Sequence, residues 1–413
     1  MTSSNLAPPN SNQVHRRRGS SIGNIDLGDT SPALSTMKTS KAQRRKSSDR
    51  MAQLSEKTTT DSQLLRKFYL SYRELTYRQT WIQPLIVLVL SVFIYLISNP
   101  EGQIHQFLEV CILPSYKIPG TDQYGKGKYD FYFVFYYAIF FTFFREFCMC
   151  MILRPLAHYF KITKESRVKR FMEQTYAIIY FGAAGCFGLW IMSKLPLRWF
   201  QTTPLYETYP HKTHDFWFKI FYLGQAAFWV QQSVILVLGL EARRSDFVEF
   251  VFHHIITIAL IWNSYRFHFT WMGLTIFVCM DISDFFLGMS KTLNYLNAPG
   301  GEAFFVFFVF VWIYLRHYIN LKVLWSVLTE FRTVGQWELN WETQQYKCWI
   351  SQPIVFFLIA ALQLVNIYWL FLILRILYRY INVGEAKDER SDDEDEADDE
   401  ADDEEDRSEK KNQ

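Results

Sequence analysis

The chain has 413 residues, of which 50% are hydrophobic and 18% aromatic, yet its mean hydropathy is only −0.03 and its net charge only +2. Both averages combine unlike segments, because the last 31 residues hold 17 acidic and 5 basic residues and leave the other 382 with 38 basic against 24 acidic, a net of +14. An ordinary soluble domain, a secreted disulfide scaffold and a fully disordered chain are excluded, because about 300 residues between two polar ends concentrate the apolar side chains.

Residues 1–80 are polar and basic, with 14 Lys and Arg residues before the first apolar stretch. They contain too few apolar groups to offset the entropy of ordering, so we predict a disordered cytosolic segment. No apolar h-region is present at the start, and no cleavable signal peptide is expected. Four serines that follow basic runs resemble sites for basic-directed kinases. They are Ser20, Ser21, Ser47 and Ser48.

Eight stretches are predicted to cross a membrane, because a bilayer core of about 30 Å needs roughly 20 mostly apolar residues per helix. They are Ile82–Ser98, Phe131–Ile152, Gln174–Met192, Phe216–Leu240, Phe247–Trp262, Trp271–Met289, Ala303–Leu324 and Ile350–Leu374. The expected fold class is therefore an all-α polytopic membrane protein. The first two spans fall in residues 81–166 and the other six in residues 167–380.

Positive charge in short loops marks the cytosolic side of a membrane protein. Basic residues gather before the first span and in the second and fourth connections. They include Arg66, Lys67, Arg73, Arg78, Arg154, Lys161, Lys164, Arg167, Lys169, Arg170, Arg243 and Arg244. The odd-numbered connections are longer and less basic. We therefore expect both termini in the cytosol, with an even number of spans between them.

The six cysteines fit no metal-finger spacing. Four of them lie in apolar stretches, where a small buried hydrophobe is the expected role. These four are Cys148, Cys150, Cys186 and Cys279. The other two, Cys111 and Cys348, fall in loops on the predicted lumenal side, so one disulfide between them is an open alternative.

Ionisable side chains inside membrane spans are costly, and each is therefore a candidate functional residue. They and the nearby amides are Arg145, Glu146, Gln225, Gln231, Gln232, Glu249, His253, His254, Asp281, Asp284, Arg316 and His317. For the second-span pair and the glutamines, interhelical contacts that fix the bundle are the favoured interpretation. The histidines and aspartates of the fifth and sixth spans form a different pattern.

These two spans are joined by a short turn around Phe267 and should pack as antiparallel neighbours. His253 and His254 precede Phe267 by 14 and 13 residues, and Asp281 follows it by 14. At 1.5 Å per residue both groups lie about 20 Å from the turn, in the cytosolic half of the membrane, so we expect histidine and aspartate to meet. Asp281 and Asp284 share one helix face, whereas the adjacent histidines point about 100° apart.

A carboxylate that accepts a hydrogen bond from one ring nitrogen of a histidine makes the other nitrogen a better base. The pattern therefore favours proton transfer or acyl transfer. A metal site is the rival chemical interpretation, because both residue types are ligands. Against it, membrane di-iron oxygenases need many clustered histidines, and five of the nine here lie in tails or loops. A buried network that only rigidifies the bundle is the remaining alternative.

The stretch from Phe218 to Leu296 contains FKIFYLGQAAFWVQQ, DFVEFVFHHIITIALIWNSY and VCMDISDFFLGMSKTLNYL. It closely resembles the signature of the ceramide synthases, members of the TLC-domain family. The shared features are the paired histidines, the D-x-S-D unit and the following K-x-x-N-Y, in order and at the family's spacing. Looser similarity covers residues 167–379, and the span layout with polar ends is similar to that of the fungal members.

Ceramide synthases join a fatty acyl group from acyl-CoA to the amine of a sphingoid base. The resemblance therefore implies a sphingosine N-acyltransferase of sphingolipid biosynthesis that uses no cofactor, because the thioester supplies the driving force. It implies that six of the spans, in residues 167–380, form a TLC-type barrel around an acyl tunnel. It also implies a (very-)long-chain acyl-CoA, dihydrosphingosine or phytosphingosine, membrane lipids and a small single-span accessory subunit as partners. A homodimer stays open, and no nucleic acid partner is expected.

The resemblance implies four catalytic residues. They are His253, His254, Asp281 and Asp284. One histidine either deprotonates the ammonium for direct attack on the thioester or first takes the acyl group as an acyl-imidazole. Three further residues are candidates for substrate binding, although packing is an equal alternative for the two cations among them. They are Lys291, Asn294 and Arg316. The alternative function is a non-catalytic TLC-domain protein that binds lipid or assists its translocation.

Residues 381–413 form an acidic segment that we predict to be disordered and cytosolic. Ser391 is followed by three acidic residues and resembles a site for an acidophilic kinase, although a solvated, self-repelling segment is the alternative. Lys410 and Lys411 match the dilysine retrieval pattern, which predicts residence in the endoplasmic reticulum membrane.

Overall fold

The computed structural model describes residues 61–197, 200–239 and 246–383, and these residues are mainly helical. In chain order the helices are α2 (Asp61–Arg78), α3 (Ile82–Ile97), α4 (Gln103–Ile112), α5 (Asp130–Phe147), α6 (Arg154–Tyr159), α7 (Glu165–Ser193), α8 (Pro204–Glu207), α9 (Phe216–Val237), α10 (Phe247–Arg266), α11 (Thr270–Tyr295), α12 (Gly301–Trp312), α13 (Asn320–Thr329) and α14 (Ser351–Val383). Two π-helical turns, η2 (Cys148–Leu153) and η4 (Ile313–Ile319), join α5 to α6 and α12 to α13. Two short antiparallel strands pair, β1 (Gln123–Tyr124) with β2 (His214–Asp215).

Seven helical stretches in this part of the chain are long and apolar enough to cross a membrane. They are Asp130–Tyr159, Glu165–Ser193, Phe216–Val237, Phe247–Arg266, Thr270–Tyr295, Gly301–Thr329 and Ser351–Asn382. The chain is therefore a multi-pass membrane protein, as predicted. The predicted count of eight is not confirmed, because the remaining candidate, α3, has only 16 residues. At 1.5 Å per residue it extends about 24 Å, less than a bilayer core.

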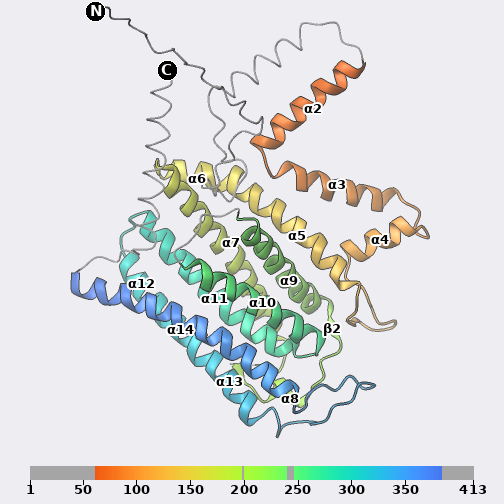
Figure 1. Cartoon of the computed structure of the whole chain (residues 1–413), viewed down its shortest axis with the longest axis vertical. Helices are drawn as coiled ribbons and strands as arrows, with labels where there is room; N and C mark the ends of the chain where they lie inside the picture. The colour runs from red at the N-terminus through yellow and green to blue at the C-terminus, as the bar shows by residue number, and fades with distance from the viewer. Residues whose placement is uncertain (1–60, 198–199, 240–245, 384–413) are drawn as a thin grey trace, which may run out of the picture.

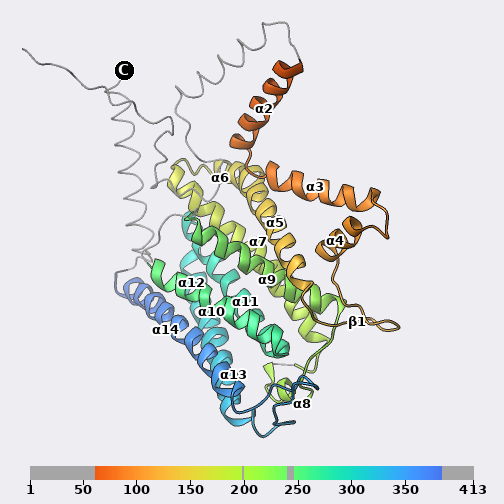
Figure 2. The same cartoon turned by 45° about the vertical axis from the view of Figure 1, so that its right-hand side comes forward.

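The long helices lie side by side in one bundle, with α2 projecting from it (Figure 1). Within the bundle, α7 packs on α9, α9 on α10, and α10 on α14. α14 packs on the span formed by α12, η4 and α13, this span packs on α11, and α11 packs back on α7. These contacts close a ring of six spans, and α5 packs on α9 outside it. Figure 2 shows α3 and α4 on the same outer side as α5. That this ring encloses an acyl chain stays a prediction.

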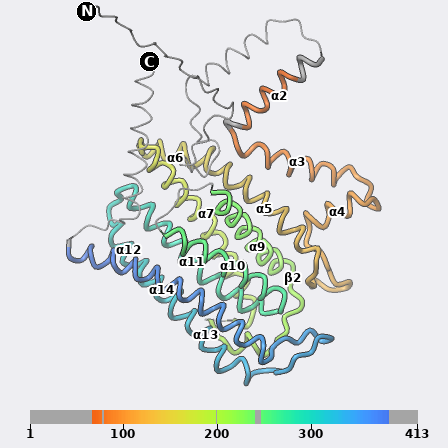
Figure 3. Tube along the Cα trace, viewed as in Figure 1, coloured from red at the N-terminus to blue at the C-terminus, as the bar shows by residue number. Residues whose placement is uncertain are grey.

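α14 runs along one side of the bundle (Figure 3), and its outward face is apolar. Five large side chains of α14 are exposed to between 47% and 69%. They are Ile354, Phe357, Leu364, Ile367 and Phe371. A row of this kind would be costly in water and is typical of a surface in contact with lipid.

Close packing of α7 on α11 depends on glycines. A Cβ on Gly188 would lie 2.7 Å from Cγ2 of Val278, and a Cβ on Gly185 would lie 3.1 Å from Cγ1 of Ile282. Small residues allow two helix backbones to approach where lipid supplies no hydrophobic driving force. The close approach holds the middle of α11, which carries Asp281, against α7.

One end of the bundle holds the short connection between α10 and α11, and we call it the turn end. Here Lys219 forms a 2.7 Å ion pair with Asp130 and donates to the carbonyl oxygens of Ser115 and Gly125. The Tyr265 hydroxyl also donates to Asp130. A buried lysine is tolerated because its three protons all have acceptors. These bonds fix the loop before α5 to α9 and α10.

All six cysteines are free. Cys111 and Cys348, for which a disulfide was one alternative, are both buried thiols. The prediction of disorder for residues 1–80 is wrong at their C-terminal end, because Asp61–Arg78 forms α2, and α14 likewise continues to Val383. Residues 1–60 and 384–413 of the two predicted disordered segments lie outside the described residues, together with Ser20, Ser21, Ser47, Ser48, Ser391, Lys410 and Lys411.

Candidate active site

The predicted histidines and aspartates come from two adjacent helices. α10 carries His253 and His254, which are buried, and α11 carries the fully buried Asp281 and the partly exposed Asp284. α10 and α11 pack against each other, as the short turn between them predicts. The two helices therefore bring the four residues into the ring, but the contacts differ from those expected.

Asp281 accepts a hydrogen bond from the side-chain amide of Gln225 on α9, over 2.5 Å. The Gln225 carbonyl oxygen in turn accepts one from the Tyr180 hydroxyl on α7, over 3.1 Å. In the described part of the chain Asp281 accepts no hydrogen bond from a histidine, so the expected contact with one of the two histidines is not formed. Its Oδ2 accepts from Gln225 of α9 instead, and its Oδ1 has no hydrogen-bond partner among the described residues.

Asp284 forms an ion pair with Arg316 of η4, with 2.5 Å between its Oδ1 and the guanidinium. The same guanidinium donates to Ser283 Oγ over 2.6 Å and to Asn366 Oδ1 over 3.2 Å, and it stacks over the Trp312 ring at 4.1 Å. A planar guanidinium presents five N–H donors in a fixed fork and can therefore serve several acceptors at once. One buried cation thus joins α11, η4 and α14.

The two histidines differ in what their ring nitrogens contact. Nδ1 of His254 lies 2.9 Å from the backbone carbonyl oxygen of Phe250. Because a carbonyl only accepts, this nitrogen carries the proton and Nε2 is the basic nitrogen of the neutral ring. Nδ1 of His253 is buried without a hydrogen-bond partner among the described residues, and Nε2 lies 3.5 Å from the Thr257 hydroxyl, a long contact.

His253 is surrounded by aromatic rings. The Trp229 ring lies 5.5 Å from it and the Trp369 ring 5.0 Å, both edge-on, and His254 is 5.8 Å away. Trp229 also lies edge-on to His254, at 5.6 Å. The histidine pair is thus held between α9 and α14 in a largely water-free environment.

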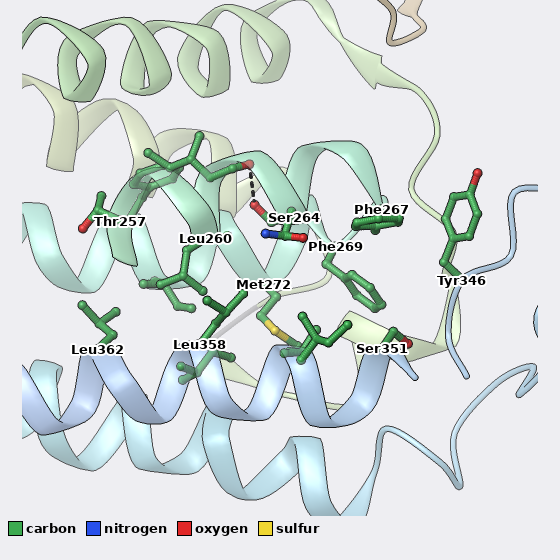
Figure 4. A pocket seen from close by; sticks show the side chains of 18 of the residues that line it. Thr257, Leu260, Ser264, Phe267, Phe269, Met272, Tyr346, Ser351, Leu358 and Leu362 are labelled. Atoms are coloured by element: carbon green, nitrogen blue, oxygen red, sulfur yellow. Dashed lines mark hydrogen bonds between the residues drawn. The ribbon is translucent and has the colours of Figure 1, made fainter. Parts of the chain in front are cut away.

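A cavity of about 280 Å³ extends from this cluster toward the turn end. His253, Asp284 and Arg316 line it together, and nearly all of its other lining is apolar. In Figure 4, Thr257 and Leu362 lie toward one end and Phe267 and Tyr346 toward the other, with the space between α10, α11 and α14. From His253 to Phe267 the length along α10 is about 21 Å. The shape and lining suit a long apolar chain.

Of the three predicted substrate-binding residues, Arg316 lies in the cluster and lines the cavity. Lys291 and Asn294 lie further along α11, beyond Asp284, and neither lines the cavity; Asn294 is exposed. The side-chain amide nitrogen of Gln363 donates a 2.7 Å hydrogen bond to Nδ1 of His317, and Arg145 pairs with Glu146 over 3.2 Å. These two contacts agree with a packing role. Within the described residues, His, Cys, Asp and Glu side chains form no group of three or more that could hold a metal ion.

Several site residues were not singled out as such from the sequence. Gln225 was interpreted as a packing residue, while Tyr180, Trp229, Trp369 and Asn366 were given no role. Ser283 was visible inside the D-x-S-D unit, and its position between the two aspartates was the available signal. The others lie on different helices, and only the packing of the ring brings them to the cluster.

Known proteins resemble this chain over most of its length. A family model described as the TLC domain matches residues 170–375. Sphingosine N-acyltransferase LAG1 and ceramide synthase LAG1, from two strains of Saccharomyces cerevisiae, are each 55% identical over 383 residues, which cover 92% of this chain and 92% of the relative. Sphingosine N-acyltransferase lac1 of Schizosaccharomyces pombe is 49% identical over 315 residues, 76% of this chain and 81% of the relative.

Proposed function

The chain belongs to the ceramide synthases, the sphingosine N-acyltransferases of the TLC-domain family, and we propose that His253 is the histidine that acts on its substrates. One observation carries this assignment. His253 lines the apolar cavity and has an unpartnered ring nitrogen, whereas Nδ1 of His254 is held by the Phe250 carbonyl. An unpartnered imidazole nitrogen beside a chain-shaped cavity is available for proton or acyl transfer.

In the proposed reaction the cavity holds an apolar chain with its reactive end at His253. The histidine takes a proton from the sphingoid ammonium, and the free amine attacks the thioester carbon of acyl-CoA. In the second mechanism the histidine attacks first and carries the acyl group as an acyl-imidazole, which the amine then cleaves. Asp284 and Arg316 form the polar wall of the cavity. Asp281 lies outside the cavity lining and is hydrogen-bonded to Gln225, so its role is one of positioning. No step requires a cofactor.

The test is ceramide formation by the purified protein from acyl-CoA and a sphingoid base. His253→Ala is expected to lower kcat by about 10²-fold or more, the usual contribution of a positioned base. His158→Ala, at an exposed histidine of α6, is the matched control and should keep full activity. A wild-type protein that forms no ceramide would refute the function. Full activity of His253→Ala would refute the assignment of this histidine alone.

The two mechanisms differ in whether an acyl-enzyme forms. Intact-protein mass measurement after incubation with acyl-CoA alone distinguishes them. An added acyl mass that is absent from His253→Ala supports the acyl-imidazole, and an unchanged mass in an active preparation supports direct attack.

We further propose the finer properties that the family resemblance implies. The acyl donor is a very-long-chain acyl-CoA, and the acceptor is dihydrosphingosine or phytosphingosine. The protein resides in the endoplasmic reticulum with both termini in the cytosol, and it works with a small single-span subunit or as a homodimer. A tagged acidic C-terminus that resists protease in sealed microsomes would contradict this topology. Size measurement of the solubilised complex distinguishes the two assemblies.

A further inference from the structure

Trp229 of α9 is a buried residue of the cavity wall with an unused hydrogen-bond donor. Its side chain is 8% exposed, and its Nε1–H has no acceptor among the described residues. Buried N–H groups are almost always paired, because an unpaired one loses its hydration without compensation. In the described structure, only Trp229 and His253 combine a buried, unpartnered side-chain nitrogen with a place in the cavity lining, and only the indole nitrogen of Trp229 is always a donor.

Trp369, on the other side of His253, provides an internal comparison. Its Nε1–H donates to Asp246 Oδ2 over 3.2 Å, so this indole is fully used in holding α14 to the start of α10. The two tryptophans contact the same histidine, at ring distances of 5.5 Å and 5.0 Å, but only Trp229 keeps its donor available. The difference points to a partner that is bound from outside the chain.

The obvious competing donor at this place is already occupied. The Arg316 guanidinium serves Asp284, Ser283 and Asn366, so moving it to a substrate oxygen would break its ion pair with Asp284 and its two hydrogen bonds. Trp229 can donate without breaking any bond. Its ring also lies beside both histidines, where the reacting carbonyl must come if His253 is to act on it.

We propose that Trp229 Nε1–H binds the carbonyl oxygen of the acyl thioester and stabilises the oxyanion that forms from it; this rests on the proposed function. When the amine nitrogen forms its bond to the carbonyl carbon, the C=O π pair moves onto oxygen and the negative charge develops there. The C=O bond then re-forms as the C–S bond breaks, and the thiolate leaves with that electron pair. The histidine takes the first proton from the ammonium and releases it to solvent, takes a second proton from the nitrogen once the N–C bond has formed, and passes this second proton to the thiolate sulfur, which gives free CoA and the amide.

Trp229→Phe tests the proposal, because phenylalanine keeps an aromatic ring and lacks the N–H. Loss of one oxyanion donor typically costs about 10²-fold in kcat, and we expect a loss of that order with little change in KM. An S-alkyl-CoA thioether, which has the acyl chain but no carbonyl oxygen, measures binding separately. Its inhibition constant is expected to stay the same in the variant. Trp325→Phe, at a residue that is 65% exposed on α13, is the matched control and should leave activity unchanged.

Each other outcome decides against the donor role. Unchanged kcat in Trp229→Phe overturns it. A parallel loss of kcat and of thioether binding overturns it too, because the indole would then serve packing. If Trp229→Phe does not fold, Trp229→Tyr, which restores a donor, decides the question. A folded and active Tyr variant supports the donor role, and an unfolded or inactive one overturns it. A wild-type protein that forms no ceramide instead refutes the proposed function, so the two failures are distinguishable.

Discussion

His253 and His254 are neighbours in the sequence but have different surroundings, and so do the aspartates opposite them. Asp281 takes its donor from Gln225, and Asp284 takes its donor from Arg316. Each carboxylate is thus paired by a residue of another helix, and His253 is left facing the cavity. At the residue scale, Gln225 and Arg316 therefore hold the two aspartates in place, whereas His253 is the residue proposed to react.

Gln225→Leu tests whether the hydrogen bond from Gln225 to Asp281 contributes to stability and activity. The substitution removes the donor to a buried carboxyl group and the acceptor of Tyr180, which we expect to cost about 1–3 kcal/mol of stability, together with a loss of activity. Adding Asp281→Leu removes the unpaired group, so the double variant should regain stability but no activity. Thermal unfolding and turnover of the four members of this cycle provide the check. Strictly additive stability losses would show that the two side chains are not coupled.

Arg316→Met should be among the most damaging single changes in the bundle. It removes the ion pair with Asp284 and the donor to Ser283 and Asn366, and the loss of one partner of a buried ion pair typically costs about 3–5 kcal/mol. Arg266→Met, at an exposed arginine of α10, is the control and should cost no more than about 1 kcal/mol. Denaturation midpoints in detergent measure both. A small effect at Arg316 would mean that water or lipid replaces its contacts.

The contact of α7 with α11 is the element whose packing sets the position of Asp281. Gly188→Ala would bring a Cβ to 2.7 Å from Cγ2 of Val278, which is itself fully buried and cannot move aside. We expect lower stability and lower activity, and partial recovery of both on adding Val278→Ala. Gly224→Ala, where no atom lies within 4 Å of the new Cβ, should be neutral. An equal loss of stability in the two single variants would contradict the role of close approach, because helix propensity alone favours alanine over glycine.

Much of the element level was predictable from the sequence, because apolar runs and basic loops report directly on the membrane. The α10–α11 hairpin was predictable for the same reason, since a short turn forces its helices to be neighbours. The order of the helices around the ring was not predictable, so the sequence alone gave no sign that Gln225 of α9 contacts Asp281 of α11. The helix bounds were also too short, as with α7, which begins at Glu165 rather than Gln174. Polar residues at helix ends carry no hydropathy signal even when the backbone stays helical.

At the scale of the whole molecule, a cluster of two histidines and a lysine lies behind the wall of the cavity at the turn end. Lys126 donates to the His211 carbonyl oxygen over 2.8 Å and lies 3.3 Å from Nδ1 of His268, which stacks on Tyr346. Tyr346 lines the cavity, so the cluster supports its far wall. Both histidines lie outside the membrane-spanning helices. Burial and the nearby Lys126 lower the pKa of His211 and of His268 to about 3.

These shifted pKa values predict that the protein loses stability as the pH falls below neutral. In the unfolded chain each histidine binds a proton near its ordinary pKa of 6.5, whereas in the folded protein it stays neutral down to about pH 3. Acid therefore favours the unfolded state by about 1.4 kcal/mol per pH unit for each histidine in that window, and the effect is absent above it. His268→Gln removes one of the two groups and keeps a polar side chain, so it should flatten the dependence of the melting temperature on pH relative to wild type. An identical slope in wild type and His268→Gln would mean that His268 is already protonated in the folded protein, with its charge balanced by a loss of the proton from Lys126.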